Sequence, residues 1–438
     1  MTSFRSAIVL GGLCTVIGYV LHLYGALPSQ MNGSSAFQYR HAVHVYKNLI
    51  QSGNELGSSF AVFHKNEPVI NVYGGYMDKR FQLPWTQETV TQTFTLSLVS
   101  VPFTFALLID RGLINLDDPV KKHLPAFSAS DVSISDLLAH RSGYPYFIDQ
   151  VPLGLWRDDY ETVLFNISRQ VPPIEPKHQM THLHSLVLIA DGLVRKLDNR
   201  HRTLAHFFME EIAWPLGLDL VIGMPRSQLY RAARTYHGSV WDAVNALLHF
   251  DIGYLWTNLV TGKSMPYGLQ REKALNLFSD YNTLYNMNPD MLEVPLASTN
   301  MFSNARSLAR LFSFLSPSHS LDNGNSSGQY ARIFSSRTLA WLLESNSTSS
   351  SPAYDRILHR WVSFTSSGLM IVNSPEGSPT YGMWDDIMGQ VVFVDPKREI
   401  SLAYTTNHAH GRTLKRDFFL SSLTEAVYHC LQSTPDTV

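Results

Sequence analysis

Hydroxyl side chains gather at the start of a long apolar segment of the chain. Thr95, Ser97 and Ser100 stand where polar residues give way to the segment 98–113. A hydroxyl becomes a nucleophile when a nearby base takes its proton. No Lys, His or Glu lies within one helical turn of Ser97 or Ser100, so we interpret both as capping or packing hydroxyls. For Thr95 the candidate base is His182, which lies far along the chain.

Two histidine pairs are candidates for metal ligands. One pair is His182 and His184, and the other is His408 and His410. Side chains two positions apart on a helix point to different faces, which argues against the first pair. The second pair has no neighbouring cluster of carboxylates or cysteines to complete a coordination sphere. We therefore expect surface histidines, and we predict no metal ion and no other cofactor.

The elements that position these side chains follow from hydrophobic periodicity. The segment 98–113 is too long for a strand, which predicts a buried helix with Gly112 as its C-terminal cap. Residues 38–51 are amphipathic and predict a second helix. The β-branched and aromatic runs 59–63 and 69–73 predict a hairpin.

The rest of the chain has a helical middle and a strand-rich end. Residues 133–343 have mostly helical patterns, with polar loops expected at 321–329 and 345–352. Strand patterns return at 389–394 and 400–404, and residues 414–431 predict a final helix. We therefore predict an α/β (α+β) fold class, in which an antiparallel sheet flanked by helices pairs both ends of the chain. A helical lobe adjoins it, with a cleft between the two.

An ordered set of short motifs between residues 38 and 430 carries a family resemblance. The motifs are Phe60 to Lys65, Tyr73 to Tyr76, Asp110 to Leu113, Leu116 to Val120, Ile134 to Gly143, Phe207 to Ile212, Pro215 to Leu218, Asn304 to Arg310, Gly389-Gln390 and Val394 to Pro396. In this order they resemble the serine β-lactamase-like hydrolases. That family includes penicillin-binding proteins, class C β-lactamases, esterases and animal β-lactamase-related domain proteins.

The resemblance implies the serine β-lactamase/penicillin-binding-protein fold and an active site of three parts. In the family, an S-x-x-K motif places a nucleophilic serine and a lysine on one face at the start of a long helix. A tyrosine of the helical lobe assists proton transfer. A K-T-G or H-x-G stretch on a strand beside the cleft binds the substrate carboxylate.

This chain departs from the family at all three motifs. The family-equivalent positions are Thr95 (nucleophile), Leu98 (lysine), Thr181 (tyrosine, followed by His182), and Trp384 and Asp386 (third motif). Leucine cannot accept a proton, and an acid in the third motif repels a carboxylate substrate. Loss of one catalytic group typically costs several orders of magnitude in rate. The combined departures predict a pseudoenzyme.

The first residues predict attachment to a membrane. Residues 7–27 contain no Asp, Glu, Lys or Arg, and a helix of about 20 apolar residues crosses a bilayer. Arg5 precedes them and no charge follows before Arg40, so the N-terminus is expected in the cytoplasm. We predict a cytoplasmic stub (1–6), a transmembrane signal anchor (7–27), a linker (28–37) and a lumenal or extracellular domain (38–438). A cleaved signal peptide and secretion is the alternative.

Within that domain, the α/β lobe is expected at 38–130 and 355–438 and the helical lobe at 131–354. Four N-x-[ST] sequons, at Asn32, Asn166, Asn325 and Asn346, suit a glycoprotein of the secretory pathway. Cys14 lies inside the apolar stretch, so we expect no disulfide with Cys430.

Charge restricts the partners. The net charge of -2 leaves no excess of Lys and Arg to neutralise phosphates, which excludes nucleic acid. We expect an unidentified small-molecule or protein ligand in the inter-lobe cleft and membrane contact through the N-terminal helix, and we leave open a homo-oligomer.

Two functions stay open at this point. The first is an inactive pseudohydrolase with a binding or scaffolding role at a membrane. The second is an active esterase, amidase or peptidase that uses Thr95 or a neighbouring serine. Close approach of Thr95, Thr181 and His182 favours the second. A cleft filled by Leu98, Trp384 or Met388 favours the first, or a membrane-tethered structural protein whose cleft has no role.

Overall fold

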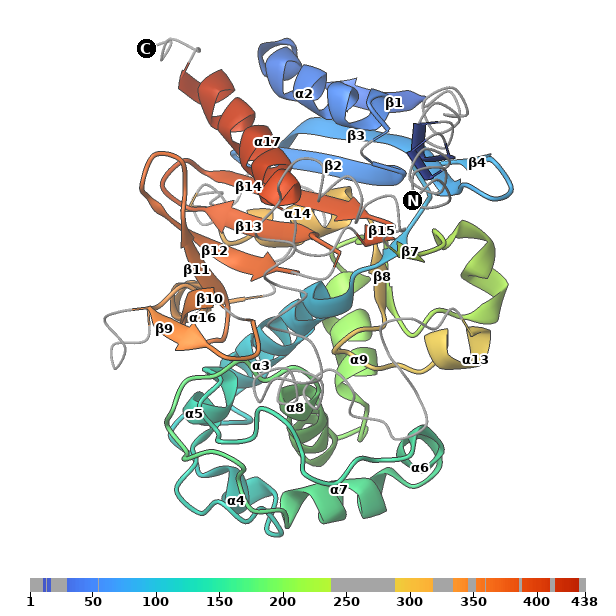
Figure 1. The fold of residues 1–438 in the computed structure, drawn as a ribbon. Helices are drawn as coiled ribbons and strands as arrows, with labels where there is room; N and C mark the ends of the chain where they lie inside the picture. Colours follow the sequence, from blue (N-terminus) through green and yellow to red (C-terminus); the bar gives the residue numbers. More distant parts are fainter. Residues whose placement is uncertain are drawn as a thin grey trace, which may run out of the picture.

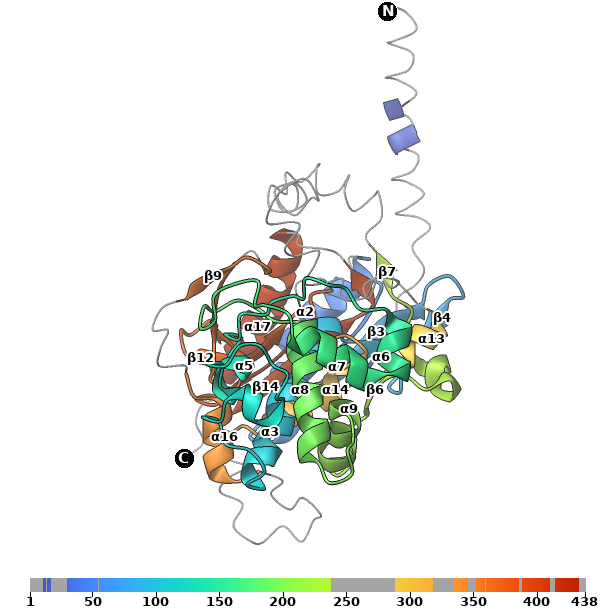
Figure 2. The same ribbon diagram turned by 90° about the horizontal axis from the view of Figure 1, so that it is seen from below.

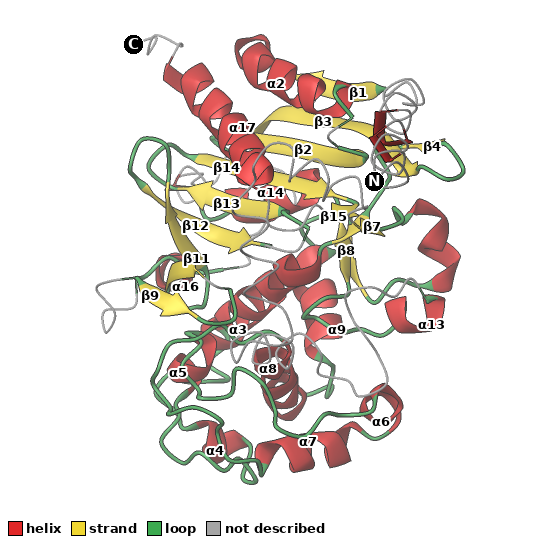
Figure 3. Ribbon diagram, viewed as in Figure 1, coloured by secondary structure: helices red, strands yellow, loops and turns green. Residues whose placement is uncertain are grey.

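A ten-stranded antiparallel sheet forms the frame of one lobe (Figure 1; Figure 3). The computed structural model describes residues 11–12, 14–16, 30–53, 55–237, 288–317, 334–345, 352–358, 360–385, 388–409 and 414–432. The strands of the sheet are β1 (Met31–Ser35), β2 (Gly57–His64), β3 (Glu67–Asp78), β4 (Leu83–Pro84), β9 (Ala353–Asp355), β10 (Arg360–Phe364), β11 (Met370–Asn373), β12 (Pro379–Trp384), β13 (Val391–Asp395) and β14 (Ile400–Thr406). Their order is β1-β3-β2-β14-β13-β12-β11-β10-β9, with β4 paired to β3. The predicted fold class is confirmed.

Helices make up most of the remaining regular secondary structure among the described residues. They are η1 (Phe37–Tyr39), α2 (Arg40–Gln51), η2 (Phe94–Val99), α3 (Ser100–Asp110), α4 (Val120–His123), α5 (Ile134–Leu138), α6 (Leu153–Asp158), α7 (Tyr160–Ser168), α8 (His184–Leu197), α9 (Leu204–Phe208), the π-helix η3 (Met209–Ala213), η4 (Arg226–Arg231), α13 (Pro289–Leu292), α14 (Ala305–Ser313), α16 (Ser336–Leu342) and α17 (Leu414–Gln432). The helices predicted at 38–51 and 414–431 are confirmed as α2 and α17.

Strands from the two ends of the chain pair in the centre of the sheet. β2 and β14 are antiparallel in a register that runs from Ile400 opposite His64 to Thr406 opposite Ser58. The predicted hairpin is β2 and β3, and Lys65 and Asn66 close it with φ values of 52° and 66°. Turns with two positive φ values match the twist of antiparallel strands.

Helices cover both faces of this sheet. α2 and α17 contact each other over one face, where Tyr46 and Val427 share a core with Phe60 (Figure 1). α14 contacts β2 and β14 on the other face, where Ala61 and Leu308 belong to the large core of the helical lobe. Because neighbouring residues of a strand point to opposite faces, Phe60 and Ala61 lie in different cores.

The strands β9 to β12 do not appear in the sequence prediction, which places late strands only from residue 389 onward. These strands are 3, 5, 4 and 6 residues long, and they form one side of the sheet up to its edge. Tyr354, Trp361 and Val372 are 47%, 70% and 40% exposed. Short strands with exposed apolar side chains lack the clean alternation that identifies a half-buried strand.

The predicted long helix is present but begins differently. Its first residues form the 3₁₀ turn η2, and regular α-helix extends only from Ser100 to Asp110. Gly112 has φ 66°, its N–H donates to the Ile109 carbonyl at 2.9 Å, and the Leu113 N–H donates to the Leu108 carbonyl at 3.0 Å. This is the Schellman arrangement that favours glycine, so the predicted cap is confirmed.

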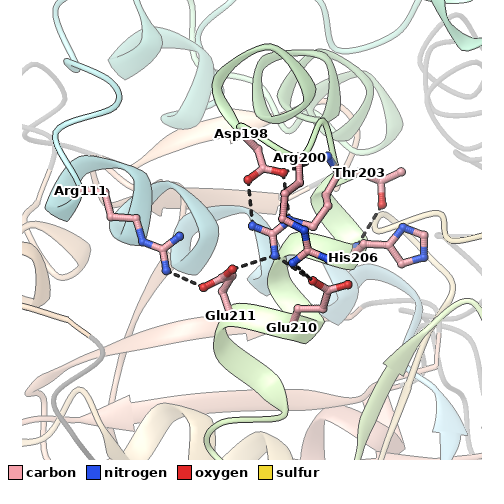
Figure 4. Close-up of polar contacts among 8 residues, drawn as sticks. Arg111, Asp198, Arg200, Thr203, His206, Glu210 and Glu211 are labelled. Atoms are coloured by element: carbon pink, nitrogen blue, oxygen red, sulfur yellow. Dashed lines mark hydrogen bonds and ion pairs between the residues drawn. The ribbon is translucent and has the colours of Figure 1, made fainter.

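A charged network holds the end of α3 to the helical lobe (Figure 4). The Arg202 guanidinium, with a side chain 9% exposed, donates to Asp198 at 2.8 Å, Glu210 at 2.8 Å and Glu211 at 2.7 Å. Glu211 also accepts a bond of 2.5 Å from Arg111, just past α3. The hydrogen bonds from Arg202 hold the pKa of Asp198 below its usual value. The network therefore fixes α3 against α8 and η3, and Figure 2 shows α7, α8 and α9 beside one another in this lobe.

The predicted signal anchor lies mostly outside the described residues. Within it, Gly11–Gly12 and residues 14–16 are helical. Among the residues that the structure describes, none of the helices combines the length and the apolar character needed to span a bilayer. The expected loop at 321–329 and the sequons Asn325 and Asn346 also fall outside the described residues, whereas Asn32 and Asn166 are exposed.

Candidate active site

The nucleophile position lies in the buried turn η2. This turn contacts β12 on one side and β8 (Met301–Ser303) on another, and it begins at Phe94, whose φ is 43°. A positive φ is uncommon for a bulky residue, so the surrounding packing must hold this sharp entry into the helix. Thr95 follows at 7% exposure. No described residue forms a hydrogen bond with its hydroxyl.

Leu98 stands at the lysine position and belongs to the core. It is 1% exposed and lies in the same apolar cluster as Leu96 and Val99. A leucine side chain cannot take a proton from Thr95. The surrounding cluster would also impose a large desolvation cost on an ammonium group at this position.

The two neighbouring serines are structural. Ser97 Oγ accepts the Met301 N–H at 3.2 Å and lies 3.4 Å from Thr93 Oγ1. Ser100 Oγ donates to the Ser97 carbonyl at 2.7 Å. Both side chains are fully buried. The interpretation of Ser97 and Ser100 as packing hydroxyls agrees with these contacts.

Thr181, at the tyrosine position, is bound to a carboxylate of the other lobe. Its backbone N–H and its hydroxyl both donate to Asp355 Oδ2, at 2.5 and 2.6 Å. Asp355 Oδ1 accepts the N–H groups of Ile357 and Leu358, at 2.8 and 2.9 Å. Asp355 is 1% exposed, so four donors satisfy a buried carboxylate. The Thr181 hydroxyl therefore points its proton at Asp355 and joins the two lobes.

His182 uses both ring nitrogens within the helical lobe. Its Nδ1–H donates to the Met180 carbonyl at 2.5 Å, and its Nε2 accepts the Tyr144 N–H at 3.2 Å. The His182 backbone N–H donates in turn to His140 Nδ1 at 3.1 Å. No lone pair is left to take a proton from Thr95, so this geometry does not make His182 the base considered for that role.

Burial keeps both histidines neutral. Desolvation lowers the pKa of His140 to about 4 and that of His182 to about 3, with repulsion from His140 as a further cause at His182. The His140 ring packs 4.5 Å from that of Phe364, measured between centroids. His140, which is hydrogen-bonded to His182, therefore packs the loop after α5 against the strand β10.

The expectation of surface histidines is wrong. His182, His184 and His408 are 0%, 2% and 7% exposed, because each fills a polar niche in the interior. His184 Nδ1 lies 2.6 Å from the Ser298 hydroxyl, and the His408 N–H donates to Thr406. His410 lies outside the described residues. Within the described part of the chain, no cluster of three or more His, Cys, Asp or Glu side chains could hold a metal ion.

The described residues of the third motif lie at the two ends of the turn that joins β12 to β13. Trp384 is half-buried and stacks on Phe393, with centroids 5.8 Å apart and an angle of 6° between the rings. The buried Asp385 carboxylate accepts the Met388 N–H at 2.8 Å. Gln390 Nε2 donates to the Gln92 carbonyl at 2.9 Å, which ties this turn to the strand before η2. Asp386 lies outside the described residues.

The residues that the family spacing assigns to the three motifs have packing and hydrogen-bonding roles in the described structure. η2 and β12 lie in contact, whereas Leu98, Thr181 and His182 are committed to packing or to other hydrogen bonds. Sequence reasoning missed Asp355. It stands between tyrosine and arginine in an unremarkable run, and nothing in the sequence pairs it with a residue 174 positions away.

Comparisons with known proteins support the family resemblance. A family model described as Beta-lactamase matches residues 44–424. The chain belongs to the beta-lactamase family. Esterase/beta-lactamase LipL of Mycobacterium tuberculosis is 26% identical over 173 residues, so the match spans 39% of this chain and 39% of that relative.

Solved structures of similar proteins give the same fold. A family VIII carboxylesterase has a TM-score of 0.74 at 20% identity, covering 92% of this chain and all of its own. A penicillin-binding protein homologue from Caulobacter crescentus has a TM-score of 0.68 at 23% identity, covering 92% of this chain and 100% of its own. The fold predicted from the motif order is confirmed: this beta-lactamase family member has the serine β-lactamase/penicillin-binding-protein architecture.

Proposed function

We propose that this chain is a catalytically silent member of the beta-lactamase family, with a binding or scaffolding role at a membrane. The observation that carries the proposal is the bond from Thr181 to Asp355. It commits the hydroxyl at the tyrosine position to a buried carboxylate of the other lobe. Together with Leu98 at the lysine position, it leaves neither of these two positions able to act as a general base for Thr95.

The rate argument follows from proton transfer. A threonine hydroxyl is a weak nucleophile unless a base removes its proton in the transition state. General-base catalysis contributes roughly 10²–10⁴-fold, and loss of a whole nucleophile–base unit costs more.

Membrane attachment is part of the same proposal. The support is the uncharged stretch of residues 7–27, with Arg5 before it and no charge until Arg40. An anchored domain needs no turnover to act, since it can hold a ligand or a second protein at the membrane surface. We propose that the domain from residue 38 onward lies in the lumen or outside the cell.

One observation favours the second candidate, an active esterase, amidase or peptidase. The Thr95 hydroxyl has no hydrogen-bond partner among the described residues, so a substrate-bound water or substrate group could activate it. The similar proteins include Esterase/beta-lactamase LipL and a family VIII carboxylesterase.

A fluorophosphonate probe separates the two functions. The full-length chain in detergent is treated with the probe and its intact mass is read, with Thr95→Ala and Ser97→Ala as matched variants. If the protein is catalytically silent, we expect no adduct. Thermal unfolding of the same sample shows that the protein is folded. Stoichiometric labelling that disappears only in Thr95→Ala would establish the active alternative instead.

A further inference from the structure

The tip of the hairpin between β3 and β4 exposes two apolar side chains beside two cations. Phe81 and Leu83 are 64% and 47% exposed. Lys79 and Arg80 precede them and are also exposed, and the Arg80 guanidinium lies 5.7 Å from the centroid of the Phe81 ring. Residues 79–83 are called the β3–β4 tip below. Large exposed apolar groups flanked by cations are typical of surfaces that bind a lipid interface.

The β3–β4 tip is held in one conformation by its base. Asp78 Oδ1 accepts the N–H groups of Arg80 and Phe81, at 2.8 and 3.3 Å. The Tyr236 hydroxyl donates to the same Asp78 oxygen at 2.7 Å and accepts the Arg80 N–H at 3.1 Å. The apolar side chains are therefore displayed on a preordered turn, and a partner would not have to order it on binding.

The first residues of β1 lie beside the end of β3 that leads to the tip. β1 is antiparallel to β3, with Met31 opposite Gly74 and Ser35 opposite Ile70. One residue earlier, the Gln30 carbonyl accepts the Gly75 N–H at 2.9 Å. Gln30 therefore lies beside Gly75, at the end of β3 that leads to Asp78 and the tip.

The distance along the chain is short. Residue 27, where the uncharged apolar stretch ends, lies three positions before Gln30. Three extended residues span at most about 10 Å. A bilayer crossed by residues 7–27 would therefore begin within reach of the sheet end that carries the β3–β4 tip.

We infer that the β3–β4 tip is a second membrane contact, which inserts Phe81 and Leu83 into the interface while Lys79 and Arg80 meet anionic lipid headgroups. This inference rests on the proposed attachment through residues 7–27. Two contacts would fix the orientation of the domain on the bilayer, whereas a single helix with a short linker leaves it free to rotate. The far edge of the sheet, with Trp361 on β10, would face away from the lipid (Figure 1).

An environment-sensitive fluorophore tests the contact in the full-length chain in vesicles. The probe is placed at Cys14, at position 81 in Cys14→Ser/Phe81→Cys, or at position 361 in Cys14→Ser/Trp361→Cys. Trp361 is the matched control because it is 70% exposed at the opposite side of the sheet. Cys430 is 2% exposed, which protects it from labelling. Quenching is measured with lipids that carry a spin label just below the headgroup.

The inference predicts blue-shifted emission at position 81 and quenching several-fold stronger than at position 361. If position 81 behaves like position 361 while Cys14 is quenched, the tip contact is overturned and the anchor stands. If Cys14 is not quenched by lipid, the attachment proposal fails, and position 81 then decides the tip contact by itself. A blue shift at 81 without lipid quenching would place a protein, such as a second copy, on the tip and would overturn the inference.

Charge reversal gives an independent measurement. Lys79→Glu/Arg80→Glu is combined with the label at position 81, and Lys65→Glu, at the turn that closes the other end of β3, is the control. We expect the double reversal to lower quenching at least two-fold on vesicles rich in anionic lipid and the control to leave it unchanged. Equal quenching in all three proteins would overturn the role given to the two cations.

Discussion

The Thr181 hydroxyl donates a hydrogen bond of 2.6 Å to the Asp355 carboxylate, across the boundary between the helical lobe and the sheet. Thr181, at the tyrosine position, therefore links the helical lobe to the sheet. In this bond the hydroxyl is the donor and the buried carboxylate is the acceptor. The contact ties β9 of the sheet to the segment just before α8.

Removal of the Asp355 carboxylate is expected to cost much more stability than removal of the Thr181 hydroxyl. Asp355→Ala leaves three buried N–H donors unpaired and should lower the free energy of unfolding by about 3 kcal/mol or more, against about 1 kcal/mol for Thr181→Val. Urea unfolding measures both. The double variant should cost little more than Asp355→Ala, and Asp131→Ala, at an exposed position, should cost under about 0.5 kcal/mol. Additive losses in the double variant would contradict the coupling.

Restoring the family lysine by itself should unfold the core. Leu98 is 1% exposed, so Leu98→Lys buries an ammonium group without a partner and should cost about 3 kcal/mol or more. Leu98→Met keeps the volume and should cost less than about 1.5 kcal/mol. Thermal unfolding of the two variants in parallel checks this. A Leu98→Lys protein as stable as the wild type would show that the position is solvated and would weaken the proposal that the protein is catalytically silent.

Acid is expected to destabilise the fold through His140 and His182. Their pKa values fall from 6.5 to about 4 and about 3 in the folded state, because burial penalises the charged ring. Between pH 6.5 and these values the unfolded chain binds more protons than the folded chain. The contribution of the two neutral histidines to the free energy of unfolding is therefore fully present above pH 6.5 and is lost as the pH falls. Each histidine contributes a slope of about 1.4 kcal/mol per pH unit.

Urea unfolding between about pH 5 and 7 measures that slope. His182→Gln removes one of the two titrating groups. Because each histidine accounts for one proton of the difference between the unfolded and folded chains, the slope should fall by roughly half. His178→Gln, at an exposed position nearby, should leave it unchanged. A slope that persists in His182→Gln would assign the pH dependence to other groups.

The charged network at the end of α3 should depend on Arg202 far more than on Arg200. The Arg202 side chain is 9% exposed and bonds to three carboxylates, whereas that of Arg200 is 63% exposed and bonds to one. Arg202→Ala leaves poorly solvated charges behind and should cost about 3 kcal/mol, while Arg200→Ala should cost under about 1 kcal/mol. Calorimetry of both variants checks the difference, and equal losses would contradict it.

Glycosylation tests the proposed lumenal side. Asn166 begins an N-x-S sequon and is exposed on α7. Expressed in a eukaryotic secretory pathway, the protein should lose mass on endoglycosidase treatment, and Asn166→Gln should remove one glycan step. A wild-type protein that enters the membrane fraction without any glycan would contradict the lumenal placement of the domain.

The sequence by itself determined the parts that depend on local pattern. Alternating and β-branched runs identify β2, β3 and β14, and an uninterrupted apolar segment ending in glycine identifies α3 with its cap. The motif order indicated the family, and the residue types at Leu98 and Thr181 led to the prediction that catalytic groups are missing. The sequence identifies these strands and this helix because their structure depends mainly on residues that are close together in the chain.

The tertiary structure decided which side chains meet. β9 to β12 are short strands that exist through pairing with one another and with β13, so their own sequence carries little signal. His182, placed on the surface from its spacing, is buried because the Met180 carbonyl and the Tyr144 N–H satisfy both ring nitrogens. Asp355 meets Thr181 only when the chain closes a loop of more than a hundred residues, and no local pattern records such a contact.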